Sequence, residues 1–85
     1  MYHAYVLKSD SFEVLYKGHT SDLEKRLKAH NEGKSPYTRN KGPWRLVYSE
    51  SFNTKSEAIK REKFFKSGKG REILNQILEQ NRVEE

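Results

Sequence analysis

The sequence feature that most constrains the fold is a pair of strand-like segments joined by a very short polar connection. Residues 2–8 and 13–18 are rich in aromatic and aliphatic side chains, and Ser9, Asp10 and Ser11 between them are turn formers. Such a connection can join antiparallel strands, but it is too short for the crossover that parallel strands need. A β-hairpin is therefore expected, and it excludes a fully parallel sheet.

A turn centred on Asp10 and Ser11 would fix the register of this hairpin. The facing residues then match in charge or in character, as stabilising cross-strand pairs do: Lys8 with Glu13, Leu7 with Val14, and Tyr5 with Tyr16. This register predicts two tyrosines side by side on one face of the sheet. Packing and the strand preference of tyrosine are a sufficient explanation for that pair.

The next segments predict a helix, a loop and a third strand. Residues 21–31 have helical spacing, and Ser21 with Glu24 forms a capping box at the start of this helix. Gly33 is a natural helix stop. Residues 34–43 form a basic loop, and residues 44–52 are predicted to be the third strand.

Two further helices are expected in the C-terminal part. Thr54 and Glu57 form a second capping box, which opens a helix that runs to about Ser67. Gly68 and Gly70 are expected to break the chain before a last helix over residues 71–82. The element order strand, strand, helix, strand, helix, helix predicts an α+β fold with helices packed on a small sheet.

Length and composition limit what the chain can be. The 85 residues suffice for one domain, expected over residues 1–80, with residues 81–85 as a frayed tail. Without cysteine, a disulfide, a thiolate metal site and a cysteine nucleophile are excluded. No apolar run could span a bilayer, and no signal-peptide pattern is found at the N-terminus. A cytoplasmic protein is expected.

The charge balance favours a polyanionic partner. The chain carries 17 basic and 12 acidic side chains, a net charge of +5. Nucleic acid is the commonest polyanionic partner of basic domains. Many small proteins are mildly basic without such a partner, so charge alone does not establish a function.

Glu62 lies in line with an apolar helical stripe that also contains Ala58, Ile59 and Phe65. A carboxylate at the edge of a core must be compensated or must reach water. One interpretation is an ion pair with Lys66, one helical turn further along the chain. The other is a metal ligand.

Arg26 and His30 share one face of the first predicted helix. Asp22 could pair with Arg26, and His30 continues the apolar stripe of Leu23 and Leu27, so both residues also have a purely structural interpretation. Together they could serve a site that cleaves phosphate esters. A guanidinium grips phosphate oxygens, and an imidazole moves protons near neutral pH.

Several common catalytic motifs are absent from the sequence. It contains no phosphate-binding P-loop, no H-E-x-x-H, no nucleophile elbow and no clustered carboxylates. A two-metal site normally needs several converging acidic residues. With Glu62 as the one well-placed candidate, a one-metal site fits the sequence better.

Several segments, taken in order and with their spacing, resemble the GIY-YIG endonuclease domain over nearly the whole chain. The similarity is greatest to compact stand-alone members without an attached DNA-binding domain. The segments are His3-Ala4-Tyr5-Val6-Leu7, Tyr16-Lys17-Gly18-His19-Thr20, Asp22-Leu23-Glu24-Lys25-Arg26-Leu27, His30-Asn31, Pro43-Trp44, Leu46-Val47-Tyr48 and Glu57-Ala58-Ile59-Lys60-Arg61-Glu62.

The resemblance implies a three-stranded antiparallel sheet flanked by helices, with a catalytic site at five positions. The family's tyrosines correspond to Tyr5 and Tyr16, its arginine to Arg26, its next helical polar group to His30 and its metal-binding glutamate to Glu62. The signature triplets read His-Ala-Tyr and Tyr-Lys-Gly here, with a lysine in place of an apolar residue. In a regular strand the side chain of this Lys17 points to the face opposite that of Tyr16.

The function that this resemblance implies is a metal-dependent endonuclease that hydrolyses DNA phosphodiester bonds. Glu62 would hold a single Mg²⁺ or Mn²⁺ ion, and Arg26 would neutralise charge on the phosphate. Tyr16, oriented by Tyr5, is the expected general base, with His30 as the competing proton acceptor. The expected substrate is nicked, branched or flap-like DNA, and a partner protein could supply further specificity.

Basic side chains are expected to grip the DNA backbone, so binding should weaken with salt. Tyr37 and Trp44 could stack on an exposed base, although Trp44 at the start of a strand fits a core position better. The basic candidates are Lys17, Lys34, Arg39, Lys41, Lys60, Lys63, Lys69 and Arg71.

Two other functions are compatible with the sequence. A nucleic-acid-binding module could retain the nuclease fold without cutting, and it would bind DNA in a salt-sensitive way without metal-dependent nicking. A small basic structural protein, such as a ribosome-associated one, would need no carboxylate on the inner face of the second predicted helix.

Overall fold

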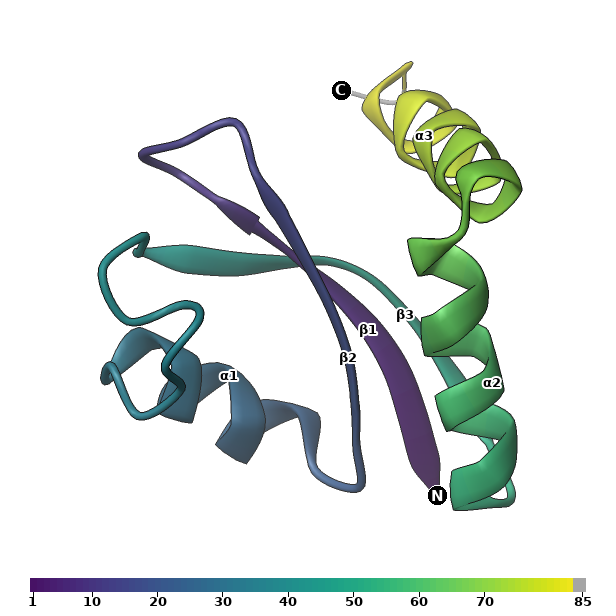
Figure 1. The fold of residues 1–85 in the computed structure, drawn as a ribbon, viewed down its shortest axis with the longest axis horizontal. Helices are drawn as coiled ribbons and strands as arrows, with labels where there is room; N and C mark the ends of the chain where they lie inside the picture. The colour runs from purple at the N-terminus through teal and green to yellow at the C-terminus, as the bar shows by residue number, and fades with distance from the viewer. Residues whose placement is uncertain (84–85) are drawn as a thin grey trace.

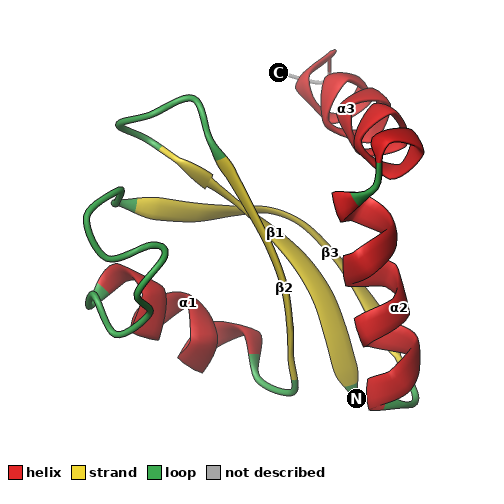
Figure 2. Cartoon of the chain, viewed as in Figure 1, coloured by secondary structure: helices red, strands yellow, loops and turns green. Residues whose placement is uncertain are grey.

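The computed structural model describes residues 1–83. Three antiparallel strands form one sheet in the order β2-β1-β3. Helix α1 lies on one side of the sheet and α2 and α3 lie on the other (Figures 1 and 2). In chain order the elements are β1 (Tyr2–Ser9), β2 (Leu15–Thr20), α1 (Leu23–Asn31), β3 (Trp44–Phe52), α2 (Lys55–Lys66) and α3 (Gly68–Val83).

The α+β class, the three-stranded antiparallel sheet and the three helices predicted from the sequence are confirmed. Helix α3 extends to Val83. Residues 84 and 85, which end the tail expected to fray, lie outside the described residues, and the domain boundary at residue 80 stays a prediction. Within residues 1–83, no helix combines the length and apolarity needed to cross a membrane.

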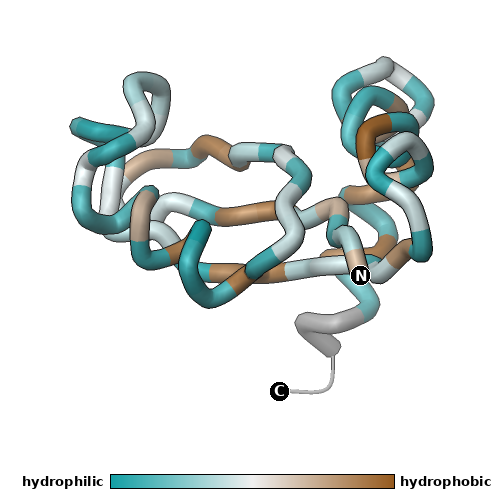
Figure 3. The backbone as a smooth tube through the Cα atoms, turned by 90° about the horizontal axis from the view of Figure 1, so that it is seen from below, coloured by the Kyte–Doolittle hydropathy of each residue, from teal (hydrophilic) through white to brown (hydrophobic). Residues whose placement is uncertain are grey.

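The central strand β1 is buried on both faces and divides the core in two. Tyr5 packs with Trp44 in a cluster that includes leucines of α1. Val6, on the opposite face, packs with Phe65 of α2 and Leu74 of α3. Hydrophobic segments of the chain accordingly run along the strands, as Figure 3 shows. Because successive side chains of a strand point to opposite faces, one strand supports both helical layers.

The predicted hairpin register is wrong by two residues. Tyr5 pairs with Gly18 rather than with Tyr16, and Leu7 pairs with Tyr16. Residues 10–14 all belong to the connection, since the Ser9 hydroxyl accepts hydrogen bonds from the backbone N–H groups of Ser11 and Phe12. A shift of two residues preserves the face of every side chain. The two tyrosines therefore still share a face, as predicted.

The two predicted capping boxes have different outcomes. At α1 the N-cap is Asp22, whose side chain accepts from the Lys25 backbone N–H, so the predicted Ser21 cap is wrong by one position. Both residues are good N-caps, and local pattern does not decide between neighbours. At α2 the predicted box of Thr54 and Glu57 is confirmed in both directions.

The predicted chain break at Gly68 and Gly70 is also wrong, because both residues belong to α3. The helices are separated at Ser67, which caps α2 in an extended conformation. Gly70 is needed for a close approach of the chain: a Cβ atom there would lie 1.7 Å from the carbonyl oxygen of Phe64. The glycine therefore lets α3 start directly against the end of α2.

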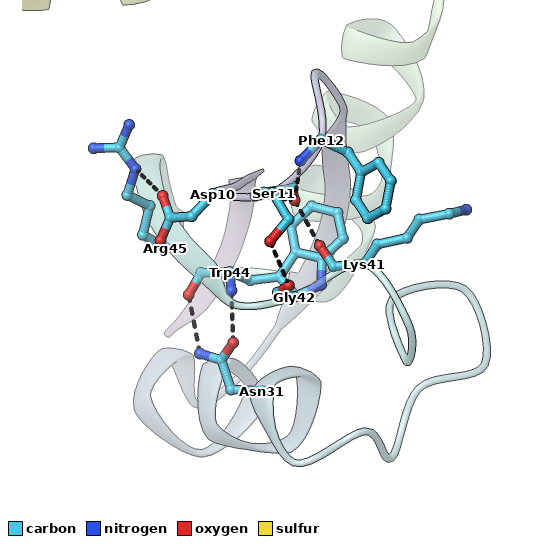
Figure 4. A network of polar contacts seen from close by, with 9 residues as sticks. Asp10, Ser11, Phe12, Asn31, Lys41, Gly42, Trp44 and Arg45 are labelled. Atoms are coloured by element: carbon cyan, nitrogen blue, oxygen red, sulfur yellow. Dashed lines mark hydrogen bonds and ion pairs between the residues drawn. The ribbon is translucent and has the colours of Figure 1, made fainter.

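The loop between α1 and β3 is fixed to the core by polar contacts (Figure 4). The Asn31 side chain donates to the Trp44 carbonyl and accepts from the Trp44 backbone N–H. The Trp44 indole N–H donates to the Thr38 carbonyl over 3.0 Å, and the Ser11 hydroxyl donates to the Gly42 carbonyl. Trp44 is 3% exposed, which confirms its core position and excludes base stacking.

Candidate active site

The centre of the candidate site is a hydrogen-bonded cluster on the α1 side of the sheet. The Tyr5 hydroxyl lies 2.9 Å from Nε2 of His30 and accepts a hydrogen bond from Nε of Arg26 over 3.4 Å. Strand β1 contributes the phenol, and the shared face of α1 contributes the other two groups. Among the described residues Arg26 forms no ion pair with Asp22, so its guanidinium is available to this cluster.

His30 is held on both sides of its ring. Its Nδ1 lies 2.8 Å from the Thr38 hydroxyl, and the residue is 1% exposed. Arg26 can only donate to the Tyr5 oxygen, so the Tyr5 hydroxyl is free to donate its own proton to Nε2 of His30. We therefore place the imidazole proton on Nδ1, from which it donates to the Thr38 hydroxyl. Burial, together with the charge of Arg26, lowers the pKa of His30 to about 4. The imidazole is therefore neutral at neutral pH.

This lowered pKa predicts an acid-sensitive fold. Below the unfolded-state pKa of about 6.5 the unfolded chain binds a proton that the buried ring does not, so stability falls as the pH is lowered from about 6.5 to 4. The expected loss is about 3 kcal/mol, at 1.36 kcal/mol for each pKa unit. Urea unfolding at several pH values measures it.

The variant His30→Gln is expected to lose most of this pH dependence, whereas His3→Gln, at a histidine near the N-terminus, should retain it. An unchanged slope in His30→Gln would show that another group causes the acid sensitivity.

Gly18 makes room for the Tyr5 side chain at the edge strand. A Cβ atom at Gly18 would lie 2.6 Å from the Tyr5 hydroxyl oxygen and 3.0 Å from Cε2 of Tyr16. Real Cβ atoms do not approach so closely, so the ring of Tyr5 lies over the glycine backbone. The absence of a side chain at this position lets a phenol from the central strand reach the edge of the sheet.

Tyr16 lies among aromatic rings and near the cluster's hydrogen bonds. Its ring centroid is 4.7 Å from that of His30, 6.2 Å from Tyr5 and 5.7 Å from Tyr37. The pKa of Arg26 is raised chiefly by its hydrogen bond to Tyr5, despite burial, with a smaller contribution from Tyr16. The guanidinium therefore stays charged beside both phenols.

Glu62 lies on the other side of the sheet and accepts hydrogen bonds from a histidine and a lysine. Its Oε1 accepts from Nδ1 of His19 over 2.6 Å, and its Oε2 accepts from Nζ of Lys66 over 2.7 Å. The side chain is 15% exposed. Burial raises the pKa of Glu62, but the hydrogen bonds from Lys66 and His19 outweigh burial and lower it overall. The ion pair with Lys66, one of the two interpretations from sequence, is present.

The two halves of the site meet at the edge strand. His19 pairs with Ala4 and faces α2, whereas Gly18 pairs with Tyr5 and faces α1. Burial raises the pKa of Tyr5 to about 12, against the hydrogen bond from Arg26, and the negative charge of Glu62 adds a smaller rise. Among the side chains that the structure describes, those bonded to Glu62 are His19 and Lys66 alone, so Glu62 makes no hydrogen bond to the cluster itself.

Residues 1–75 match the family described as the GIY-YIG catalytic domain. The chain belongs to the GIY-YIG family. It is 51% identical over 67 residues to UPF0213 protein CPE1444 of Clostridium perfringens, covering 78% of this chain and 71% of that protein. It is 43% identical over 67 residues to UPF0213 protein HQ_3675A of Haloquadratum walsbyi, covering 78% and 75%.

A solved structure agrees with this assignment. The solution NMR structure of the UPF0213 protein BH0048 from Bacillus halodurans has a TM-score of 0.53 and 36% identity, over 91% of this chain and 85% of that one. The GIY-YIG family consists of nuclease domains that act on DNA, in general with a divalent metal ion. The GIY-YIG resemblance seen in the sequence is thereby confirmed.

The basic residues expected to bind nucleic acid are spread over several elements of the GIY-YIG domain. Lys17 is half-buried on β2, and its neighbours include Lys66 and Arg71. Lys34 forms an ion pair with Glu32 at 3.2 Å. The ammonium of Lys41 lies 4.1 Å from the Tyr37 ring centroid. The remaining candidates are exposed: Arg39 in the loop, Lys60 and Lys63 on α2, and Lys69 and Arg71 on α3.

Sequence reasoning missed two residues of this candidate site. His19 binds the predicted metal ligand, and Thr38 holds the predicted proton acceptor. His19 is 43 residues from Glu62 in sequence, so no local spacing links them. The sequence did hold one signal for His19. Because successive side chains of a strand point to opposite faces, the residue after Gly18 lies on the α2 side of β2.

Proposed function

We propose that the chain is a metal-dependent endonuclease that hydrolyses DNA phosphodiester bonds and selects nicked, branched or flap-like DNA. One observation carries this proposal: a charged guanidinium and two phenols lie on one side of an edge strand, and an ionised carboxylate is hydrogen-bonded to the other side of the same strand through His19. A cation stabilises the charge that develops on a phosphate during hydrolysis, and a carboxylate can hold a metal ion that assists the same reaction.

The donor set fits one Mg²⁺ or Mn²⁺ ion held by Glu62. Its carboxylate is ionised at neutral pH because its pKa is lowered. Within the described residues no group of three or more acidic, histidine or cysteine side chains gathers around a metal site. Mg²⁺ is commonly bound by one or two carboxylates together with waters and substrate phosphates. When bound, the ion polarises a phosphate oxygen and stabilises charge on the leaving oxygen.

A cation must compete with Lys66 for the Glu62 carboxylate. The side chain of Lys66 is 53% exposed, whereas that of Glu62 is 15% exposed. The solvated ammonium of Lys66 can therefore turn towards a DNA phosphate when a cation takes its place. Arg26 stays charged beside the phenols and grips the phosphate through its N–H groups.

Tyr16 is the better general base of the two candidates. Both ring nitrogens of His30 are engaged and the residue is 1% exposed, so water has no free nitrogen to approach. Tyr5 stays protonated because its pKa is raised to about 12. In the proposed mechanism Tyr16 first gives up its own proton to solvent, and the resulting phenolate takes the proton of the attacking water. Tyr5 orients Tyr16, and His30 positions Tyr5.

The purified protein is expected to nick supercoiled plasmid and branched DNA with Mg²⁺ and not with EDTA. The variant Arg26→Lys keeps a positive charge but loses the planar N–H array, so the nicking rate should fall on the order of 10²-fold. Gel separation of nicked from supercoiled plasmid measures both results. Lys25→Arg, next to Arg26 on the exposed side of α1, is the matched control and should cut normally.

Salt-sensitive DNA binding without Mg²⁺-dependent nicking would identify the chain as a non-catalytic binding module. Equal cutting of linear duplex, nicked and branched DNA would contradict the proposed structure selectivity alone. Faster cutting of a matched RNA would contradict DNA as the preferred substrate.

A further inference from the structure

A pocket of about 300 Å³ opens at the outer edge of β2, beside the candidate active site. It is lined by Leu15, Tyr16 and Lys17 of β2, by Tyr37 of the following loop and by Lys66 of α2. The pocket therefore lies where the α1 side and the α2 side of the molecule meet. We call it the Tyr37 pocket.

Tyr37 is an exposed aromatic side chain that the structure holds in place. It is 52% exposed, yet its ring lies 5.7 Å from Tyr16 and beneath the ammonium of Lys41. Its neighbour Thr38 is fully buried and bonds to His30. A fixed, exposed ring loses little conformational entropy on binding, which favours its use as a stacking surface.

The rim of the Tyr37 pocket is positively charged. Lys17 and Lys66 line it, and among the described residues no acidic side chain does. Burial lowers the pKa of Lys17, and the charges of Arg71 and Lys66 lower it further. The three cations therefore repel one another, and an anion placed between them would relieve that repulsion. Aromatic walls with a cationic rim match a planar base linked to phosphates.

The pocket also adjoins the proposed chemistry. Tyr16 is both a wall of the pocket and the proposed base, and Lys66 both lines the pocket and binds Glu62 at 2.7 Å. A nucleotide in the pocket would therefore flank the scissile phosphate. Both faces of a base within a duplex are covered by its stacked neighbours, so only an unpaired or extruded base could present its face to Tyr37.

We propose that the Tyr37 pocket binds one unpaired nucleobase of DNA next to the scissile phosphate, with Tyr37 as the stacking residue and Lys17 and Lys66 on the flanking phosphates. This inference rests on the proposed nuclease function and names its substrate class. It attributes selectivity to an unstacked nucleotide rather than to a base sequence, since stacking tolerates every base.

The test measures binding by fluorescence anisotropy in EDTA, so that no cutting takes place. The probes are duplexes with one unpaired thymidine, with an abasic residue in its place, or with full pairing. Removing the base should weaken binding about 5- to 100-fold, as expected for one stacked base. Tyr37→Ala should cause a similar loss on the thymidine probe and almost none on the abasic probe, and Tyr37→Phe should bind normally.

Phe12 provides a matched control, because it is 53% exposed in the β1–β2 connection and lies outside the pocket. Phe12→Ala should bind all probes like the unchanged protein. Equal losses of Tyr37→Ala on the thymidine and abasic probes would overturn the proposal, because they would show a general structural effect. Equal or tighter binding of the fully paired duplex would overturn it too. So would tighter binding of an RNA duplex that carries one unpaired uridine in place of the thymidine.

The binding test of the Tyr37 pocket and the nicking assay can fail independently of each other. Base-dependent binding without any Mg²⁺-dependent nicking would support the pocket and reject the nuclease. Nicking at the same rate with and without the unpaired base would support the nuclease and reject the pocket.

Discussion

Replacing Glu62 with glutamine is expected to slow Mg²⁺-dependent nicking on the order of 10³-fold, because the metal contributes several kcal/mol to transition-state stabilisation. The amide keeps the size of the side chain but not its charge, so it binds a hard cation weakly. DNA binding in EDTA should be retained or strengthened, since the variant removes a negative charge and frees Lys66 from its 2.7 Å ion pair.

This contrast between binding and cutting makes the test specific. A misfolded variant would lose both activities, whereas loss of a metal ligand removes cutting alone. Glu79→Gln, at an exposed carboxylate of α3, changes the net charge equally and should cut at the normal rate. Normal nicking by Glu62→Gln would reject Glu62 as the metal ligand.

Replacing Gly18 with alanine is expected to lower activity on the order of 10²-fold, since a misplacement of about 1 Å at a catalytic site can cost that much. The new Cβ atom would lie 2.6 Å from the Tyr5 hydroxyl oxygen and 2.7 Å from its Cζ. Tyr5 must therefore move, and its hydrogen bonds with Arg26 and His30 move with it. Overpacking of this kind also destabilises a fold by about 1–3 kcal/mol.

Gly68→Ala is the matched control, because within the described residues a Cβ atom at Gly68 meets no atom within 4 Å apart from its chain neighbours and the backbone of its own helix. It should leave activity unchanged and should not destabilise the helix that begins there. Urea unfolding and the plasmid assay measure both variants. Stability losses of Gly18→Ala and Tyr5→Phe should be less than additive, because removing the hydroxyl removes one of the two shortest contacts of the new Cβ atom, while the contact with Cζ remains. Full activity of Gly18→Ala would contradict the role assigned to Tyr5.

Local patterns predicted the elements of this fold well. The capping box of Thr54 and Glu57 and the strand over residues 44–52 depend only on neighbours in sequence, and both are confirmed. The hairpin register was wrong because the Ser9 hydroxyl organises a longer connection than the turn residues suggested. The break predicted at Gly70 was wrong for another reason: the glycine is required by contact with Phe64, not by a turn.

The candidate site depends on contacts that sequence spacing does not reveal. Arg26 and His30 could be placed on one helical face because they are one turn apart, and both reach Tyr5. The bond between His19 and Glu62 joins a strand to a distant helix. Only the pairing of β2 with β1 and the packing of α2 bring these two residues together.

The position of the proposed reaction centre at the sheet edge determines how a long DNA molecule reaches it. The proposed chemistry surrounds the outer rim of a three-stranded sheet, beside a pocket at its edge strand. A filament of any length can approach such a rim sideways, react at one point and depart without threading through a channel. Neither arrival nor departure then requires a hinge or lid to open.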